Sequence, residues 1–458
     1  MVDRALLLLT AELAAEHLAG LAERPAGAQA GFPELRAVLG GPLPEEGVAA
    51  ERVIEELARD AAPGLVASPG PRYFGFVTGG ALPAALAADW LASAWDQNAF
   101  SAVSSPAAAL VEEVVAGWLL ELFGLPSAAS VGLTTGAQMA NVAGLAAARG
   151  ALLAAQGWDV DARGLAGAPP VRVLAGEEAH VTVFRALRLL GFGRSAIETV
   201  DADGQGRMDA RALAAALAAG EGPAIVCAQA GNVNTGACDP LRDVVGAARE
   251  HGAWVHVDGA FGLWAAASPA LSPLVAGAAG ADSWATDGHK WLNVPYDCGI
   301  VAVRDPEAHR AAMGMTAAYL VPGAAGERSS SDFVPEASRR ARGFAVYAAL
   351  RSLGRSGVAE LVERCCALAL RLAERLRVEP GIEVLNEVVL NQVLLRVGDD
   401  DATTDAVVGR VQADGTCWLG GTRWQGRAAM RVSVSNWSTT EADVDRAAEA
   451  IVNAAAPR

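Results

Sequence analysis

The chain has 458 residues, 52% of them hydrophobic and 19% charged, so it can bury a large core and is expected to form two or three structural units. Its net charge of −16 argues against a general nucleic-acid or anionic-membrane surface, and no apolar run approaches the ~20 residues of a membrane span. The six cysteines show neither C-x-x-C spacing nor the density of a disulfide framework, so we expect a cytoplasmic protein without a bound metal, whose partners are small molecules and itself.

Residues 1–66 are expected to form a helical N-terminal arm. Leu6, Leu9 and Leu13, and later Leu57 with its apolar neighbours, recur at the spacing of a helix face, and turn-rich stretches with proline and glycine separate them. Such an arm has no core of its own. It must pack on another surface, which is either the main body or a second subunit.

Residues 67–340 are expected to form a large α/β domain, because short β-branched runs alternate there with helical patterns rich in alanine and leucine. The clearest strands are 171–174, 224–227 and 254–257, and the helices between them are 139–149, 183–190 and 209–219. Open sheets of this kind bind ligands at the carboxyl ends of their strands, so the loops that follow the strands are expected to carry the chemistry.

Residues 341–458 are expected to form a smaller α+β domain. A long helical stretch over 342–376 precedes three strand-like runs and a final helix from Glu441; the runs lie at 382–385, 393–396 and 430–434.

Lys290 is the only lysine in the chain, and arginine fills the other cationic positions among the 36. Arginine supplies positive charge as well as lysine does, but its guanidinium stays protonated and cannot form an imine with an aldehyde. A Schiff-base nucleophile is therefore one explanation of this exception, and chance in a lysine-poor composition is the other. The neighbouring motifs decide between them.

Asp258 ends the predicted strand 254–257, and a buried carboxylate there could keep a pyridine nitrogen protonated, which makes the ring an electron sink. The alternative is a turn cap. Gly136 and Ala137 join a turn to a long helix, whose free backbone N–H groups could bind a phosphate. This turn matches neither the P-loop nor the G-x-G-x-x-G pattern.

His180 follows the strand 171–174, and its flat ring could stack on a cofactor ring. Asn234 and Thr235 follow the strand 224–227 and could hydrogen-bond a phenolic oxygen of the cofactor or the substrate. Each residue alone has a plain structural explanation. The conjunction of helix-start amides, a loop histidine, a strand-end aspartate and a lysine along successive strands of one sheet favours a site.

At this point the chain resembles fold-type I pyridoxal-phosphate enzymes, and specifically the group II decarboxylases, which include aromatic-amino-acid and glutamate decarboxylases. The resemblance covers most of the chain. It is carried by Arg-Tyr-Phe-Gly-Phe at 72–76, Ser-Pro-Ala at 105–107, His-Val-Asp-Gly-Ala at 256–260 and Asp-Gly-His-Lys-Trp-Leu at 287–292, of which the last two are specific. It implies an α/β fold with a mainly parallel seven-stranded sheet and helices on both faces.

The resemblance also implies roles for individual residues. Lys290 would form the Schiff base with pyridoxal 5'-phosphate, Asp258 would bind the pyridine nitrogen and His180 would cover the ring face. Other residues would contact the phosphate, the ring or the substrate: Gly136, Ala137, Gln138 and His289 the phosphate, Ala260, Asn234 and Thr235 the rest of the cofactor, and Phe76, Thr78, Asn98, Phe100 and Arg431 the substrate. Asn98 and Phe100 match positions that reach the neighbouring subunit's pocket, which implies a homodimer with shared active sites.

Arg431 is a candidate anchor for the substrate carboxylate, and a structural arginine is the alternative. A permanent grip on the departing carboxylate would favour the ground state. Phe76, Phe100 and Trp95 are expected near the pocket, but they do not identify the amino acid.

The sequence departs from the family pattern at two places. Gly288 replaces a proline found in many members, which affects loop stiffness. In aromatic-amino-acid decarboxylases a loop ahead of an Arg-Arg pair carries a tyrosine thought to return a proton to the substrate carbon, whereas the loop 327–335 ahead of Arg339 has none, and Tyr319 lies upstream.

We therefore predict decarboxylation of an L-amino acid to an amine with release of CO₂. Transamination, aldol cleavage and decarboxylation-dependent oxidation remain alternatives on the same cofactor, as does an inert cofactor-binding protein.

Overall fold

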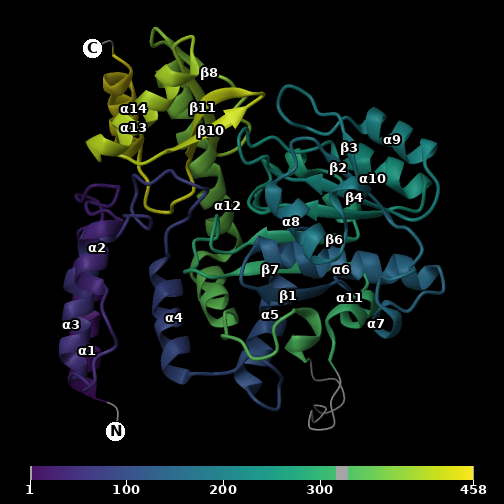
Figure 1. Cartoon of the computed structure of the whole chain (residues 1–458), viewed down its shortest axis with the longest axis horizontal. Coiled ribbons are helices and arrows are strands. Elements are labelled where there is room, and N and C mark those ends of the chain that lie inside the picture. Colours follow the sequence, from purple (N-terminus) through teal and green to yellow (C-terminus); the bar gives the residue numbers. More distant parts are fainter. Residues whose placement is uncertain (1–2, 316–328, 457–458) are drawn as a thin grey trace.

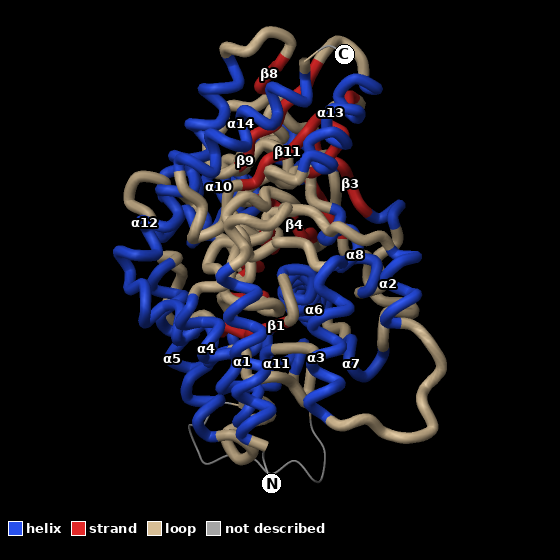
Figure 2. Tube along the Cα trace, turned by 90° about the vertical axis from the view of Figure 1, so that its left-hand side faces the viewer, coloured by secondary structure: helices blue, strands red, loops and turns tan. Residues whose placement is uncertain are grey.

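The N-terminal helices stand beside the rest of the molecule in the computed structural model, which describes residues 3–315 and 329–456 (Figure 1). They are α1 (Arg4–Ala19), α2 (Phe32–Leu39) and α3 (Ala50–Ala61), and none of them contains a buried residue. The connection between α2 and α3 loops away from the other elements (Figure 2). The predicted helical character of this region is confirmed.

A seven-stranded sheet forms the centre of the large unit, with the order β1-β7-β6-β5-β4-β2-β3. Its strands are β1 (Ser130–Thr134), β2 (Arg172–Gly176), β3 (Ile197–Val200), β4 (Ala224–Gln229), β5 (Trp254–Asp258), β6 (Ser283–Asp287) and β7 (Gly299–Val303). Only β7 runs antiparallel to its two neighbours, and the other pairs of adjacent strands are parallel. The mainly parallel seven-stranded sheet that the resemblance implied is therefore confirmed.

Helices cover both faces of this sheet (Figure 1). Apolar side chains on one face pack against α6 (Ala137–Ala155), α8 (Val181–Leu189) and α11 (Pro306–Met313). The other face packs against α5 (Pro106–Leu122), α9 (Ala210–Ala219) and α10 (Leu241–Glu250). Because side chains alternate along a strand, Val255 and Val257 of β5 enter this second core, whereas His256 and Asp258 lie on the face that α6 covers.

The remaining helices of the large unit lie at its edges. They are the short α7 (Val160–Arg163) and α4 (Pro83–Trp95), which packs against α12 (Gly343–Arg377). The sequence predicted a long helical stretch over 342–376, and α12 occupies this stretch with a break at Gly354, where φ is 63° and ψ is 179°. Glycine adopts this left-handed backbone without the steric cost that a Cβ would bring. Since α12 also contacts α5, α14 and the small sheet, it connects the two units.

The C-terminal unit is a four-stranded antiparallel sheet, ordered β10-β11-β9-β8, with two helices. Its elements are β8 (Ile382–Val384), β9 (Gln392–Val397), α13 (Asp401–Asp414), β10 (Gly420–Trp424), β11 (Arg427–Ser433) and α14 (Glu441–Ala455). The sequence predicted a strand from residue 430, whereas β11 begins at Arg427. Its first residues pair with β10 in a hairpin, and β10 has no clear apolar pattern that would have predicted this pairing.

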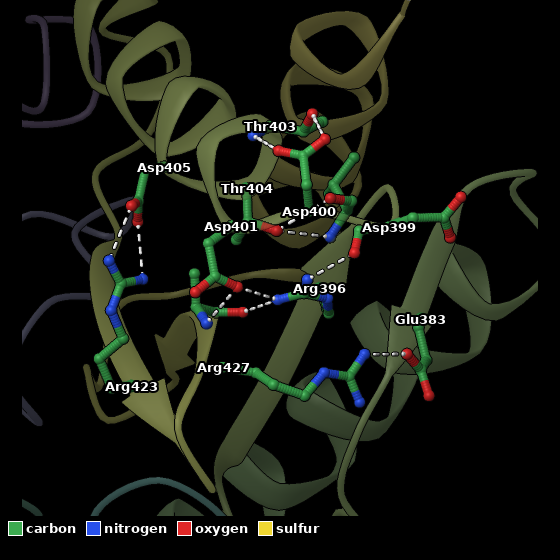
Figure 3. A network of polar contacts seen from close by, with 12 residues as sticks. Glu383, Arg396, Asp399, Asp400, Asp401, Thr403, Thr404, Asp405, Arg423 and Arg427 are labelled. Carbon is green, nitrogen blue, oxygen red and sulfur yellow. Dashed lines mark hydrogen bonds and ion pairs between the residues drawn. The ribbon is translucent and has the colours of Figure 1, made fainter.

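Arg396 links three elements of this unit (Figure 3). Its Nη1 donates to Oδ1 of Asp401 and to the carbonyl oxygen of Ala428, both at 2.8 Å, and the same Asp401 oxygen accepts the N–H of Ala428 at 2.9 Å. The start of α13 is thereby fixed to β9 and β11. The last of these strands carries Arg431 toward the large unit.

None of the helices within residues 3–315 and 329–456 is both long and apolar enough to cross a bilayer.

Candidate active site

Lys290 follows β6, the strand that carries Asp287 at its carboxyl end. Its Nζ lies 3.0 Å from Oδ2 of Asp287, and Oδ1 of this buried carboxylate accepts the backbone N–H of Ala137 at 2.6 Å. One carboxylate therefore connects the lysine with the N-terminus of α6, where a helix has unpaired N–H groups.

Asp258 ends β5, the neighbour of β6 in the sheet, and is 4% exposed. Its Oδ2 accepts a hydrogen bond from Nδ2 of Asn141 at 3.2 Å, and its Oδ1 accepts the N–H of Ala260 at 3.2 Å. Both carboxylate oxygens are therefore held by donors from the chain. Asp258 and Asp287 lie at the same edge of the sheet, as expected for the carboxyl ends of parallel strands.

His180 is the N-cap residue of α8, and its Nδ1 lies 2.7 Å from the hydroxyl of Thr182. Burial lowers the pKa of His180, the nearby charge of Asp258 acts in the opposite direction, and Lys290 and Arg431 act with burial. These interactions show that the predicted ring-facing histidine, aspartate and lysine share one neighbourhood with Arg431. They also favour a neutral imidazole at neutral pH.

The turn at Gly136 lies against His289. A Cβ at position 136 would come within 3.3 Å of Cε1 of His289, so the close approach depends on glycine. Nδ1 of His289 accepts the N–H of Cys298 at 3.1 Å, and burial lowers the pKa of this histidine. Gln138 donates to the carbonyl oxygen of Thr182 at 3.2 Å and so ties the start of α6 to the start of α8.

An aromatic wall, defined as Tyr73, Phe76, Tyr296 and Trp418, adjoins His289, the residue before the lysine. Trp418 stacks on Tyr73 at 5.0 Å and on Phe76 at 5.4 Å between ring centroids, and Tyr296 lies 4.4 Å from the ring of His289. Burial and the nearby Tyr296 raise the pKa of Tyr73 to about 12. Thr78 is buried at the end of the same segment, and a Cβ on the next residue would overlap the carbonyl oxygen of Lys290.

Arg431 projects from β11, and its Nη1 donates to the carbonyl oxygen of Val233 at 3.0 Å. Burial lowers its pKa to about 10, which leaves it a cation at neutral pH. It therefore both supports the loop after β4 and brings positive charge to the neighbourhood of His180.

Four of the predicted site residues make their described hydrogen bonds to residues other than Lys290, Asp258, His180 and Arg431. Thr235 donates its hydroxyl proton to Gln205 and accepts the N–H of Ala237, and Asn234 accepts a hydrogen bond from Thr422. Asn98 accepts the N–H of Arg339 at 3.0 Å, and the carbonyl oxygen of Phe100 accepts the N–H of Ser331 at 3.1 Å. Within one chain, these bonds tie Asn98 and Phe100 to the segment 331–339.

The tyrosine-free loop is only partly described. Tyr319, Glu327 and Arg328 lie outside the described residues, whereas Ser330–Phe333 form a short 3-10 turn.

Sequence reasoning missed Asp287, Asn141 and, apart from Phe76, the members of the aromatic wall. Asp287 follows a strand in the same way as Asp258, and this signal could have found it. Asn141 is a polar residue inside an apolar helix, which is a weaker signal. The contact between Tyr73 and Trp418 joins distant parts of the chain and has no local signal.

Comparison with known proteins agrees with this geometry. Residues 34–397 match the model of the pyridoxal-dependent decarboxylase conserved domain. The chain belongs to the pyridoxal-dependent decarboxylase family.

Among the relatives of this decarboxylase, an L-2,4-diaminobutyrate decarboxylase of Rhizobium meliloti (strain 1021) is 31% identical over 90% of the chain and 83% of the relative. An aromatic-L-amino-acid decarboxylase of Bacillus atrophaeus is 27% identical over 86% and 82%. A crystal structure of Oryza sativa TDC with PLP and tryptamine superimposes with a TM-score of 0.91 and 25% identity, covering 99% of this chain and 97% of that chain. The predicted family, fold, cofactor and amino-acid decarboxylase activity are thus confirmed.

The residues present fit pyridoxal phosphate. The donor set contains an amine for its aldehyde, a buried carboxylate for its pyridine nitrogen, a neutral imidazole for its ring face and a helix N-terminus for its phosphate. Among the described residues no group of His, Cys, Asp and Glu is placed to hold a metal ion.

Proposed function

We propose that this decarboxylase removes CO₂ from an aromatic L-amino acid and that the residues around Lys290 have the roles that the sequence predicted. The observation that carries the proposal is the pairing of the single lysine with Asp287, beside Asp258 and His180. Pyridoxal phosphate, when bound, supplies the sink for the electron pair that CO₂ leaves behind.

The chain's own residues prepare the site for this chemistry. Lys290 supplies the amine that binds the cofactor, and the buried carboxylate of Asp258 holds a proton at the pyridine nitrogen. The neutral ring of His180 covers one face and excludes water. Gly136, Ala137, Gln138 and His289 receive the phosphate, and Ala260 lies against the ring.

Arg431 is our candidate for the substrate's α-carboxylate, because it is a partly buried cation near His180. The alternative is that it only supports the loop after β4 through Val233. A substrate role predicts that Arg431→Met raises KM and leaves the thermal midpoint close to that of the wild type. A structural role predicts that Arg431→Met lowers the thermal midpoint and leaves KM close to that of the wild type.

The aromatic wall supports an aromatic substrate. Phe76 is 66% exposed and Tyr296, which lies against the ring of His289, is 62% exposed, so the wall still has ring surface available for a ligand. Aromatic pairs gain roughly 0.5–1.5 kcal/mol beyond the burial of their area. A tryptophan decarboxylase of Oryza sativa, 29% identical to this chain, acts on such an amino acid by its name, whereas the Rhizobium relative's name gives diaminobutyrate.

A panel of amino acids tests the substrate and the reaction together. We expect CO₂ and one equivalent of amine from tryptophan, tyrosine or phenylalanine, and little from glutamate or 2,4-diaminobutyrate. Preference for either of the last two would contradict the aromatic assignment. Keto acid or aldehyde in place of amine would contradict plain decarboxylation.

A homodimer with shared active sites is the second part of the proposal. Helices α1 and α3 bury none of their residues, and three of their leucines, Leu7, Leu8 and Leu57, are each more than half exposed. A cavity of about 710 Å³ also lies between α1 and the body, lined by Trp90 and other apolar side chains. Apolar helix faces of this kind are stabilised by burial against a second copy.

Mixing two inactive variants tests the shared site. If Phe100 serves the neighbouring subunit, Lys290→Ala mixed with Phe100→Ala forms heterodimers that contain one intact site. We expect activity to return to about a quarter of the wild-type value, the statistical share of intact sites after random exchange. No recovery, despite exchange demonstrated by tagged subunits, would place Phe100 in its own subunit's site.

Domain boundaries near residues 66 and 340 and a cytoplasmic location are proposed on the sequence alone. Limited proteolysis and cell fractionation test them.

A further inference from the structure

Asp258 ends a buried polar row, which consists of Trp254, Ser283, His256, Asn141 and Asp258. The indole Nε1 of Trp254 lies 2.9 Å from Oγ of Ser283, and the same oxygen lies 2.8 Å from Nδ1 of His256. Nε2 of His256 lies 2.9 Å from Oδ1 of Asn141, whose Nδ2 donates to Asp258 at 3.2 Å. The row crosses from β6 and β5 to α6.

The fold brings these residues together through sheet register. Residues 254, 256 and 258 lie on one face of β5, and His256 pairs with Ser283 of the adjacent parallel strand. Helix α6 covers this face and contributes Asn141. One turn further along α6, Gly144 leaves room for the imidazole, since a Cβ there would lie 2.9 Å from Cε1 of His256.

Every hydrogen bond in the row has a fixed direction. Nδ2 of Asn141 donates to Asp258, so the other atom of the amide, Oδ1, is the acceptor that faces His256. Nε2 of His256 must then carry the proton. Burial lowers the pKa of His256 to about 3, so the ring is neutral and its Nδ1 accepts from Ser283. The indole N–H of Trp254 only donates, and it completes the row by donating to Ser283.

Asn141, His256 and Ser283 are each fully buried, and within the described part of the chain their side-chain hydrogen bonds lead toward Lys290 only through Asp258. Reversing any member would leave two acceptors or two donors facing each other away from water, which is costly. The row therefore favours one orientation of the Asn141 amide and of the Asp258 carboxylate that it contacts.

We propose that Asn141, His256 and Ser283 are positioning residues that hold the carboxylate of Asp258 in the orientation in which it accepts from the pyridine nitrogen of the cofactor. This inference rests on the proposed role of Asp258. It assigns a function to three residues that lie outside the contacts expected for the cofactor itself.

The experiment compares two matched serine variants with Asn141→Ala. Ser283→Ala removes the hydroxyl that meets His256. Ser130→Ala removes a buried hydroxyl of β1, in the same sheet, that lies 2.8 Å from Nδ1 of His309 in α11. Both lose one buried hydroxyl–imidazole contact, but only the first lies in the row. For each apo protein we would measure the thermal midpoint, the dissociation constant of pyridoxal phosphate, and the absorption spectrum after cofactor addition. The loaded enzyme gives kcat and KM.

For Asn141→Ala we expect the dissociation constant of pyridoxal phosphate to rise about tenfold and kcat to fall at least about tenfold, because a hydrogen bond to a charged group is lost, with KM nearly unchanged. Ser283→Ala should change the dissociation constant and kcat in the same direction by about threefold, and its absorption spectrum should also differ from that of the wild type. Ser130→Ala should lower the thermal midpoint by a similar amount and leave affinity, spectrum and kcat as in the wild type.

Identical cofactor affinity, spectrum and kcat in the two serine variants would overturn the proposal, and so would wild-type values in Asn141→Ala. If Asn141→Ala fails to fold, the serine pair decides alone. The cofactor titration needs no substrate, so a wild type that binds pyridoxal phosphate but produces no amine would refute the proposed function while the row is still tested.

Discussion

Nζ of Lys290 lies 3.0 Å from Oδ2 of Asp287, and the other oxygen of that carboxylate accepts the backbone N–H of Ala137. A single buried group thus fixes both the reactive amine and the first residue of α6. Because the contact is an ion pair between an ammonium group and a carboxylate, an arginine at position 290 can keep an ion pair with Asp287 while losing the ability to form an imine.

We therefore expect borohydride reduction of the enzyme with pyridoxal phosphate to attach the cofactor to one side chain, that of Lys290, as read by peptide mass spectrometry. Lys290→Arg should fold with a similar thermal midpoint but retain no cofactor after reduction, and its kcat should fall by about a thousandfold or more. Since the chain has no other lysine, a labelled lysine peptide in wild type has one origin. Equal labelling of wild type and Lys290→Arg would contradict the assignment.

The ion pair between Arg339 and Glu112 is the most buried one described, at 2.6 Å with side chains 1% and 2% exposed. Arg339→Met leaves the carboxylate of Glu112 buried without its partner, so we expect the free energy of unfolding to fall by about 3–5 kcal/mol. Arg355→Met is the matched control, because the pair of Arg355 with Glu121 has the same 2.6 Å length but is mostly exposed.

Urea unfolding measures both changes. The control should differ from wild type by less than about 1 kcal/mol. Similar losses in the two variants would show that burial does not set the strength of these pairs.

The site residues that lie in local sequence motifs could be predicted, whereas contacts that depend on which strands are neighbours in the sheet could not. Asp258 and Lys290 were predicted because each follows a strand and each lies in a specific motif. The pairing of His256 with Ser283 was not, because it requires β5 and β6 to be neighbours in a fixed register. His180 was expected at a loop, but its role as the N-cap of α8 depends on where the helix begins, two residues earlier than its apolar pattern indicates.

The arm shows the same limit at a larger scale. Helical spacing of leucines was enough to predict α1 and α3, whereas the surface that covers their exposed apolar faces depends on tertiary or quaternary contacts. The segment around Phe76 likewise meets Trp418 only because the small unit folds back onto the large one.

The neutral state of His256 predicts a pH dependence of stability. Its pKa falls from the usual 6.5 to about 3, so between these values the unfolded chain binds a proton that the folded chain does not. Stability from this group is fully present above pH 6.5 and is lost as the pH falls toward 3. Below pH 6, the free energy of unfolding of the wild type should fall by about 1 kcal/mol more per pH unit than that of His256→Gln. The limiting slope for one proton is about 1.4 kcal/mol per pH unit.

Urea unfolding of both proteins at pH 5, 6, 7 and 8 measures this difference in slope, which does not depend on how much the substitution itself destabilises the fold. The two curves should run parallel above pH 7. Parallel curves down to pH 5 would show that the imidazole is protonated in the folded state.

Gly144 allows the imidazole of His256 to approach α6, so a methyl group there should be costly although alanine is the better helix former. A Cβ at position 144 would lie 2.9 Å from Cε1 and 3.0 Å from Nδ1 of His256. We expect Gly144→Ala to lower the free energy of unfolding by about 1–3 kcal/mol, the usual cost of overpacking. In Gly150→Ala, on the same helix, the added Cβ meets nothing within 4 Å, and we expect a gain of up to about 1 kcal/mol. The displaced ring is hydrogen-bonded to Asn141, so Gly144→Ala, but not Gly150→Ala, should also weaken the binding of pyridoxal phosphate. If Gly144→Ala is destabilised but binds the cofactor as tightly as the wild type, the packing of His256 does not affect the orientation of Asp258.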